Sequence, residues 1–162
     1  MRLQIKNRRS RLSSKEQSEF SGLLGGWADS PKIVEMKKFI QHGSVDTYAH
    51  CKKVAETSFW LSRRLHMKVD EKSLVRGALL HDFYLYDWHD GKPERKRHGF
   101  THPLVALANA DRAFSLNDIE RNIIGSHMWP LTLRRVPRCK EAVLVCLADK
   151  QCSLIETLFC RR

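Results

Sequence analysis

The sequence lacks the features that mark membrane-spanning and disulfide-stabilised proteins. No stretch approaches the roughly 20 consecutive apolar residues that cross a bilayer, and no apolar segment follows the basic start as it would in a signal peptide. The cysteines are odd in number and include no Cys-x-x-Cys pair, which argues against a disulfide framework and against a thiolate zinc site. We therefore expect a cytoplasmic protein with no membrane partner. The cysteines at 146, 152 and 160 lie in an apolar helical pattern and are expected to be buried, reduced thiols.

Strand-like alternation and internal repeats are also missing. With 162 residues the chain is long enough for one hydrophobic core and too short for two ordinary domains. Its 42% of hydrophobic residues is typical of a folded protein rather than a disordered one. The net charge of +11 is compatible with nucleic-acid binding, an anionic small substrate or simple solubility. Solvated faces account for most of the local basic runs, which lie at residues 6–11, 95–97 and 134–135.

Apolar residues recur at helical spacing between capping and stop signals along most of the chain. The expected helices cover residues 13–24, 30–42, 44–65, 70–82, 101 onward, 117–128 and 141–159, with a charged loop over 88–100. In the helix that Thr101 would cap, we expect Leu104, Leu107 and Ala108 to face inward. The fold class is therefore all-α, a single-domain helical bundle. Its main domain would cover residues 30–162, after a basic segment and short helix at 1–29.

An adjacent base and acid, His81 and Asp82, end the apolar run Gly77–Leu80. Burying an unpaired carboxylate is costly, and a metal ion is one of the few partners that satisfies both groups at once. Asp149 interrupts a second apolar helix in the same way. Imidazole and carboxylate without thiolate suit iron, manganese, zinc or nickel better than calcium. Helical bundles build such sites from side chains that project inward from facing helices.

The order His50, His81-Asp82, Asp149 resembles the HD-domain superfamily of metal-dependent phosphohydrolases. With His102 and His127 included, the order H…HD…H…H…D is similar to the binuclear branch of that family. The resemblance covers roughly residues 36 to 156. The short sequence segments around the histidines also resemble those of a compact bacterial group of HD proteins. It implies a helical bundle of the HD-domain type.

The resemblance also implies a role for each of these residues. His50, His81, Asp82 and Asp149 would hold one divalent transition-metal ion, and Asp82 would bridge to a second ion held by His102 and His127. A hydroxide between the two metals would attack phosphorus, with Asp82 and His81 as the catalytic residues. The chain is then expected to be an enzyme that cleaves a phosphate mono- or diester, in particular one of a small nucleotide. The ions would be iron, manganese, zinc or nickel.

Several polar residues beside the expected ligands are candidates for substrate binding. Arg95, Arg97 and Arg134 could hold phosphate oxygens, because guanidinium groups match phosphate geometry. Lys150 follows the expected ligand Asp149 and is placed at a pocket rim. His98 could support a ligand, contact the substrate or lie on the surface.

Departures from well-known relatives leave the substrate open. The Gly-Tyr-Pro motif of cyclic-di-GMP phosphodiesterases is absent, and residues 83–87 contain no lysine of the kind that dinucleoside-tetraphosphate hydrolases place soon after the HD pair. The aromatic residues found there could stack on a base or pack in the core. One alternative function is a mixed-valent di-iron oxygenase with the same ligand order. Another is a non-catalytic nucleotide-sensing or nucleic-acid-binding module, which would not need both His102 and His127.

Overall fold

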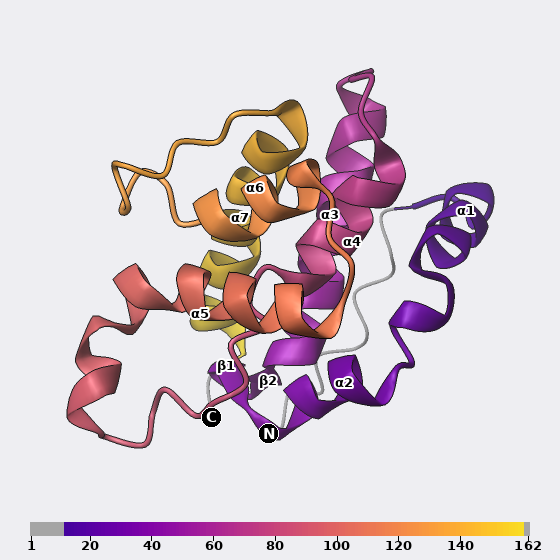
Figure 1. Ribbon diagram of the computed structural model, residues 1–162. Coiled ribbons are helices and arrows are strands. Elements are labelled where there is room, and N and C mark those ends of the chain that lie inside the picture. Colours follow the sequence, from indigo (N-terminus) through magenta and orange to yellow (C-terminus); the bar gives the residue numbers. More distant parts are fainter. Residues whose placement is uncertain (1–11, 161–162) are drawn as a thin grey trace.

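The computed structural model describes residues 12–160, apart from the side chains of Glu94 and Arg95. Helices dominate this part of the chain, which confirms the all-α fold class, and one two-stranded antiparallel ribbon accompanies them (Figure 1). No helix in residues 12–160 is long and apolar enough to cross a membrane. The α-helices are α1 (Ser14–Leu24), α2 (Pro31–Val34), α3 (Thr47–Arg64), α4 (Glu71–Leu80), α5 (His98–Ala113), α6 (Asp118–Ser126) and α7 (Lys140–Phe159). The 3-10 helices are η1 (Gly25–Trp27), η2 (Glu35–Lys38) and η3 (Pro93–Arg97), and the strands are β1 (Ile40–His42) and β2 (Val45–Asp46).

Four helices begin within three residues of the starts that the sequence predicts. The side chains of Ser13, Asp46, Asp70 and Asn117 each accept a hydrogen bond from a backbone N–H in the first turn of α1, α3, α4 and α6, respectively. Such a bond satisfies one of the donors that the start of a helix leaves unpaired. The local chemistry of these residues therefore determines where the helices start.

The helix predicted over residues 30–42 is wrong beyond its first turn. Ser30 caps α2 as expected, but the chain passes through η2 into strand β1, which pairs with β2 around a turn at Gly43. Thr47 holds the chain where it passes from η2 into β1, because its N–H and its hydroxyl both donate to the carbonyl of Phe39. The strand directs the side chain of Gln41 inward, where its amide donates to the carboxylate of Asp82, just after α4.

Helix α5 also differs from the prediction. It begins at His98, three residues before the expected cap Thr101, and its residues Leu104 and Ala108 are exposed rather than inward. The face that it buries instead is the one that carries His102 toward the centre of the bundle. The buried residues on this face are His102, Pro103, Ala106 and Ala110.

The core lies between α3, α4, α6 and α7, and α1 packs onto the outside of α3 and α4 (Figure 1). Phe20 of α1 stacks against Phe59 of α3, with ring centroids 5.8 Å apart, so the short N-terminal helix shares this core. The predicted boundary at residue 29 stays a prediction. The basic run at residues 6–11 lies outside the described residues. All five cysteines are free, and Cys146 and Cys152 are buried as expected, whereas Cys160 is only partly buried.

A glycine lets two of the core helices approach closely. A Cβ atom on Gly77 of α4 would lie 2.6 Å from the Cδ1 atom of Ile123 in α6. Because of this close approach the carboxyl ends of α4 and α6 meet, and the rings of His81 and His127, which follow those ends, lie 4.8 Å apart. The packing of α4 on α6 thus begins to assemble the site.

Candidate metal centre

The structure brings all six predicted metal ligands together in the interior of the bundle. Each is buried, and five helices contribute them, either from within a helix or from the residues that follow its last turn. His50 lies in α3, His102 in α5 and Asp149 in α7. His81 and Asp82 follow α4, and His127 follows α6.

Four of the six residues form one group of ligand atoms. The Nε2 atom of His50 lies 3.1 Å from Oδ1 of Asp149 and 3.8 Å from Oδ2 of Asp82. The Nε2 atom of His81 lies 3.3 Å from the same Asp82 oxygen and 3.6 Å from the same Asp149 oxygen. Atoms that are each about 2.1 Å from one metal ion are about 3.0 to 3.4 Å apart. Two of the four distances lie in this range and the other two exceed it by 0.2 and 0.4 Å, so the group is close to the size of a single coordination sphere.

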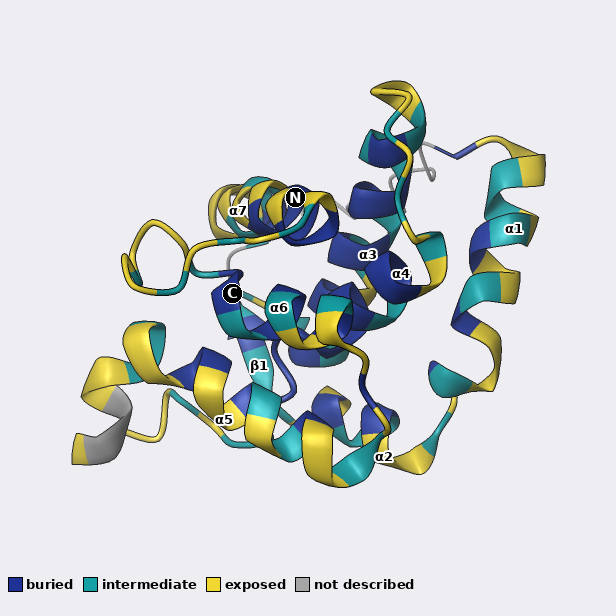
Figure 2. Cartoon of the chain, turned by 45° about the horizontal axis from the view of Figure 1, so that its top comes forward, coloured by how far each residue is buried: buried dark blue, intermediate teal, exposed yellow. Residues whose placement is uncertain are grey.

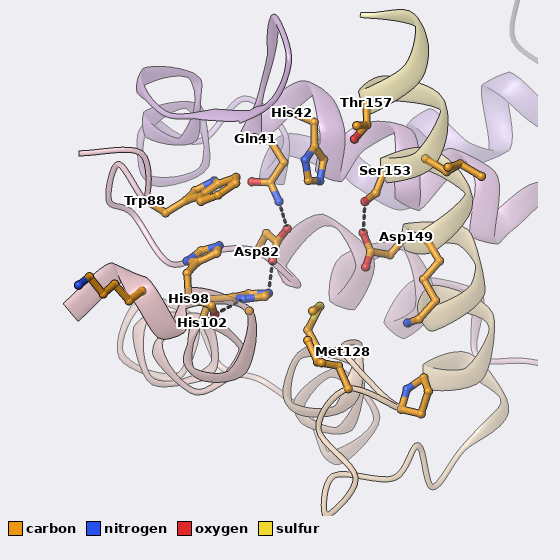
Figure 3. Close-up of a pocket in the computed structure, with 16 residues that line it drawn as sticks. Gln41, His42, Asp82, Trp88, His98, His102, Met128, Asp149, Ser153 and Thr157 are labelled. Carbon is orange, nitrogen blue, oxygen red and sulfur yellow. Dashed lines mark hydrogen bonds and ion pairs between the residues drawn. The ribbon is translucent and has the colours of Figure 1, made fainter. Parts of the chain in front are cut away.

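A second group forms around the other oxygen of Asp82. Oδ1 of Asp82 lies 3.1 Å from Nε2 of His102 and 3.3 Å from Nε2 of His127, and the two Nε2 atoms are 2.8 Å apart. Asp82 thus directs one carboxylate oxygen to each group, as a ligand that bridges two ions would. Figure 3 shows this carboxylate between Gln41 and His102, with Asp149 across the opening. The Gln41 amide donates to Oδ2 of Asp82 over 2.5 Å and so holds the carboxylate in place.

All four imidazoles use their Nδ1 atom for support and turn Nε2 toward the centre. The Nδ1 atoms of His81, His102 and His127 lie 2.7 to 2.8 Å from the backbone carbonyls of Ala78, His98 and Ile124, respectively. The Nδ1 atom of His50 lies 2.8 Å from a carboxylate oxygen of Glu156. Carbonyl and carboxylate oxygens only accept, so each Nδ1 carries a proton, and a ring that loses its second proton exposes a lone pair on Nε2 to the centre. Metal-binding histidines are oriented in this way, by a carbonyl or carboxylate that accepts from the ring nitrogen facing away from the metal.

The convergence of these lone pairs requires a positive charge between them. Two Nε2 lone pairs 2.8 Å apart beside a carboxylate oxygen repel one another unless a proton or a metal ion lies among them. Nε2 of His81 and Oδ1 of Asp82 are moreover buried without a hydrogen bond to any described residue. Buried polar atoms are rarely left without a partner. The donor set therefore fits metal ions.

In the ion-free protein, protons on His50 and His81 supply part of this positive charge. Burial alone would lower the pKa of His50, but hydrogen bonds with Asp149 and Glu156 hold it well above its ordinary value. Burial would likewise lower the pKa of His81, yet the charge of Asp82 raises it. Burial would raise the pKa of Asp82, which the charges of His81 and His102 keep well below its usual range. The carboxylates thus retain their negative charge and attract cations.

Comparison with known families agrees with this geometry. The family model of the HD domain matches residues 47–152, which is more than half of the chain. The chain belongs to the HD domain family. Membership confirms the family that the order of His and Asp residues predicts, whereas the binuclear branch stays a prediction. No curated protein and no solved structure matches the chain.

A cleft of about 890 Å³ opens from the cluster of candidate ligands in this HD domain to the surface. Asp82, His102 and Asp149 lie at its floor, and its outer walls carry apolar side chains (Figure 3). Clefts of a few hundred to a thousand cubic ångströms hold small-molecule ligands. The residues that form its walls and rim are Gln41, His42, Trp88, Lys96, His98, Gly99, Met128, Pro130, Leu131, Lys150, Ser153, Leu154 and Thr157.

The predicted substrate-binding residues lie at different distances from this cleft. His98 and Lys150 line it, whereas the exposed Arg97 and Arg134 do not. The side chain of Arg95 lies outside the described residues. The ammonium group of Lys150 donates to the backbone carbonyls of His127 and Cys146, which holds it at the rim rather than over the metal ligands. The roles of all five residues in substrate binding stay predictions.

His98 supports the site and also forms part of the cleft wall. Its backbone carbonyl accepts the proton on Nδ1 of His102, and its ring stacks on that of His102 with centroids 4.5 Å apart. The other face of the ring stacks on Trp88 at 4.9 Å, and its Nδ1 hydrogen-bonds to the hydroxyl of Tyr86. Phe83 and Tyr84, by contrast, are buried in the core, so they pack in the HD domain rather than present their faces to a base.

Sequence reasoning missed two residues that support the ligands. Glu156 is buried on α7, two helical turns beyond Asp149, and orients His50. The seven-residue spacing from Asp149 to a second acid in an apolar helix is the signal that could have revealed it. Gln41 reaches Asp82 only because residues 40–42 form a strand, and its amide oxygen accepts from the hydroxyl of Tyr84. No local pattern predicts that pairing.

Proposed function

We propose that this HD domain is an enzyme that hydrolyses a phosphate mono- or diester at a centre of two divalent transition-metal ions. The observation that carries the proposal is the position of Asp82, whose two carboxylate oxygens each face a separate group of histidine nitrogens. His50, His81, Asp82 and Asp149 would hold one ion. Asp82, His102 and His127 would hold the other. Imidazole and carboxylate ligands are consistent with iron, manganese, zinc or nickel.

When bound, two such ions lower the pKa of a coordinated water and offset the charge of a phosphoryl group. The protein's own residues orient these ligands and shape the space above them. Glu156 and the backbone carbonyls hold the imidazole rings, and Gln41 holds the bridging carboxylate. The opening of the cleft beside Asp82, His102 and Asp149 leaves room for a phosphate group next to the ligands.

We propose a small nucleotide as the substrate. Its phosphate would lie at the floor of the cleft, with Lys96 and Lys150 at the rim. The sugar and base would lie between Trp88 on one side and Met128 and Leu131 on the other. The ring of His98 stacks on Trp88 with centroids 4.9 Å apart, and the ring of His89 lies against Trp88 at a tilt, with centroids 3.7 Å apart. A base would therefore contact the edge of this stack rather than insert into it.

The first test is metal content and hydrolysis in matched variants. Wild-type protein should hold two transition-metal ions per chain and hydrolyse at least one compound in a panel of nucleotides and simple phosphate esters. His127→Ala should retain about one ion, because the group around His50 keeps its ligands, and should lose most activity. Asp82→Asn should lose activity while circular dichroism shows a folded chain. His66→Asn, at an exposed histidine far from the centre, should change neither quantity.

The same experiments separate the alternatives. Substrate-dependent oxygen uptake by iron-loaded protein, without hydrolysis, would identify an oxygenase instead, and anaerobic activity with manganese would exclude one. Nucleic-acid binding that weakens steeply with salt, without turnover, would indicate a binding module. Wild-type protein that holds no metal at these six residues would refute the proposal.

A further inference from the structure

Helix α7 carries large aliphatic side chains on both of its faces. One face lies in the core, beside α3 and α6. The opposite face presents Val143, Leu147, Leu154 and Leu158, which are 44%, 56%, 61% and 49% exposed. We call these four residues the α7 stripe. Figure 2 shows α7 dark blue on the side toward α3 and yellow on the side away from it.

A stripe of this kind is unusual on a solvent-facing helix. Surface helices normally place charged and polar residues opposite their core face, and a helix that is apolar on both sides is normally buried on both sides. The only exposed charged side chain between Val143 and Leu158 is Lys150. Its ammonium group is held by the carbonyls of His127 and Cys146 in its own chain. The stripe therefore has the character of a contact surface.

The spacing of the stripe is the same in both directions along the chain. The intervals between its members are 4, 7 and 4 residues, so its centre lies between Lys150 and Gln151. At about 100° per residue, the four side chains lie within about 60° of one another around the helix axis, over a length of about 22 Å. An antiparallel copy of α7 would then place Leu147 opposite Leu154, and Val143 opposite Leu158.

We propose that the α7 stripe binds the same stripe of a second copy of this chain, on a two-fold axis that passes between Lys150 and Gln151. A two-fold interface uses one patch on both subunits and must therefore be complementary to itself, which the reversible spacing satisfies. A different partner would require no such spacing. The interface would also border the cleft beside Asp82 and Asp149, because Leu154 lines this cleft together with Leu131 of the loop before α7. This proposal does not depend on the proposed function.

The mass of the metal-loaded protein in solution provides the first test. Analytical ultracentrifugation in the micromolar range should give about twice the chain mass of 18.9 kDa. Leu147→Asp and Leu154→Asp should each raise the dissociation constant by at least about 100-fold, because each substitution occurs twice in the dimer and a buried leucine contributes roughly tenfold or more. Leu65→Asp, at a leucine 58% exposed at the end of α3, is the matched control and should leave the dimer intact. Circular dichroism and metal content should be unchanged in all three variants.

A compensating pair tests the register. In the proposed dimer Leu147 of one copy faces Leu154 of the other, so L147D and L154R combined in one chain should form two ion pairs across the axis. The double variant should recover much of the dimerisation that each single change removes. A monomeric wild-type protein, a dimer unaffected by L147D, assembly into open chains larger than a dimer, or the absence of any recovery in the double variant would each overturn the proposal.

Discussion

Glu156 offers a sharp test of the proposed centre, because it hydrogen-bonds to His50, a ligand of only one of the two proposed ions. Its carboxylate lies 2.8 Å from Nδ1 of His50, and both side chains are almost completely buried. A hydrogen bond to a charged group contributes about 1.5 to 3 kcal/mol, and loss of such a partner typically weakens metal binding by 10- to 100-fold. Glu156→Leu should therefore lower the affinity for the proposed ion at His50 and Asp149 by about that factor. It should leave the ion held by His102 and His127 nearly unchanged.

The assay is stepwise release of metal to a competing chelator, which measures the two affinities separately. Glu156→Gln should show a smaller loss, because its amide oxygen can still accept the proton on Nδ1 of His50. Glu141→Leu is the matched control, since Glu141 is a buried acid at the other end of α7 that accepts from the backbone of Asp70. It should reduce stability without changing either affinity. An equal loss at both sites in Glu156→Leu, or no loss at either, would refute the reasoning.

Two further predictions concern stability. The pKa values of His50 and His81 are raised in the folded, metal-free protein, so it keeps protons that the unfolded chain releases above about pH 6.5. Metal-free protein should lose stability as the pH rises through this range, by at most about 1.4 kcal/mol per pH unit for each histidine, and the stabilisation by added metal should grow with pH. Denaturant unfolding at several pH values, with and without metal, measures both effects. If the stability of the metal-free protein does not fall as the pH rises, the raised pKa values of His50 and His81 are contradicted. Gly77→Ala should lower the free energy of unfolding by about 1 to 2 kcal/mol, because overpacking against Ile123 outweighs the gain in helix propensity. Adding Ile123→Val to this variant should restore part of the lost stability. If Gly77→Ala alone stabilises the protein, α4 and α6 can move apart easily and the reasoning is refuted.

Local chemistry was sufficient to predict most helices. Ser13, Asp46, Asp70 and Asn117 cap helices that begin within three residues of their predicted starts, because a capping side chain bonds to a backbone group only two or three residues away. Prediction failed where a distant partner decides the conformation. Residues 40–42 form a strand that is fixed by contacts with Thr47 and Asp82, and these contacts leave no periodic signal in residues 30–42.

The same division holds for the site. The order of histidines and acids in the sequence was sufficient to predict the family. The sequence also predicted the kinds of ligand, because an acid and a histidine within apolar helices need a partner wherever those helices pack. Only the tertiary structure decided which nitrogen of each ring faces inward and how Asp82 divides its two oxygens between the two groups. It also recruited Glu156, which reaches His50 across 106 residues of sequence. All of these features depend on contacts between different helices. Such contacts are determined by how α3, α4, α5, α6 and α7 pack rather than by any spacing along the chain.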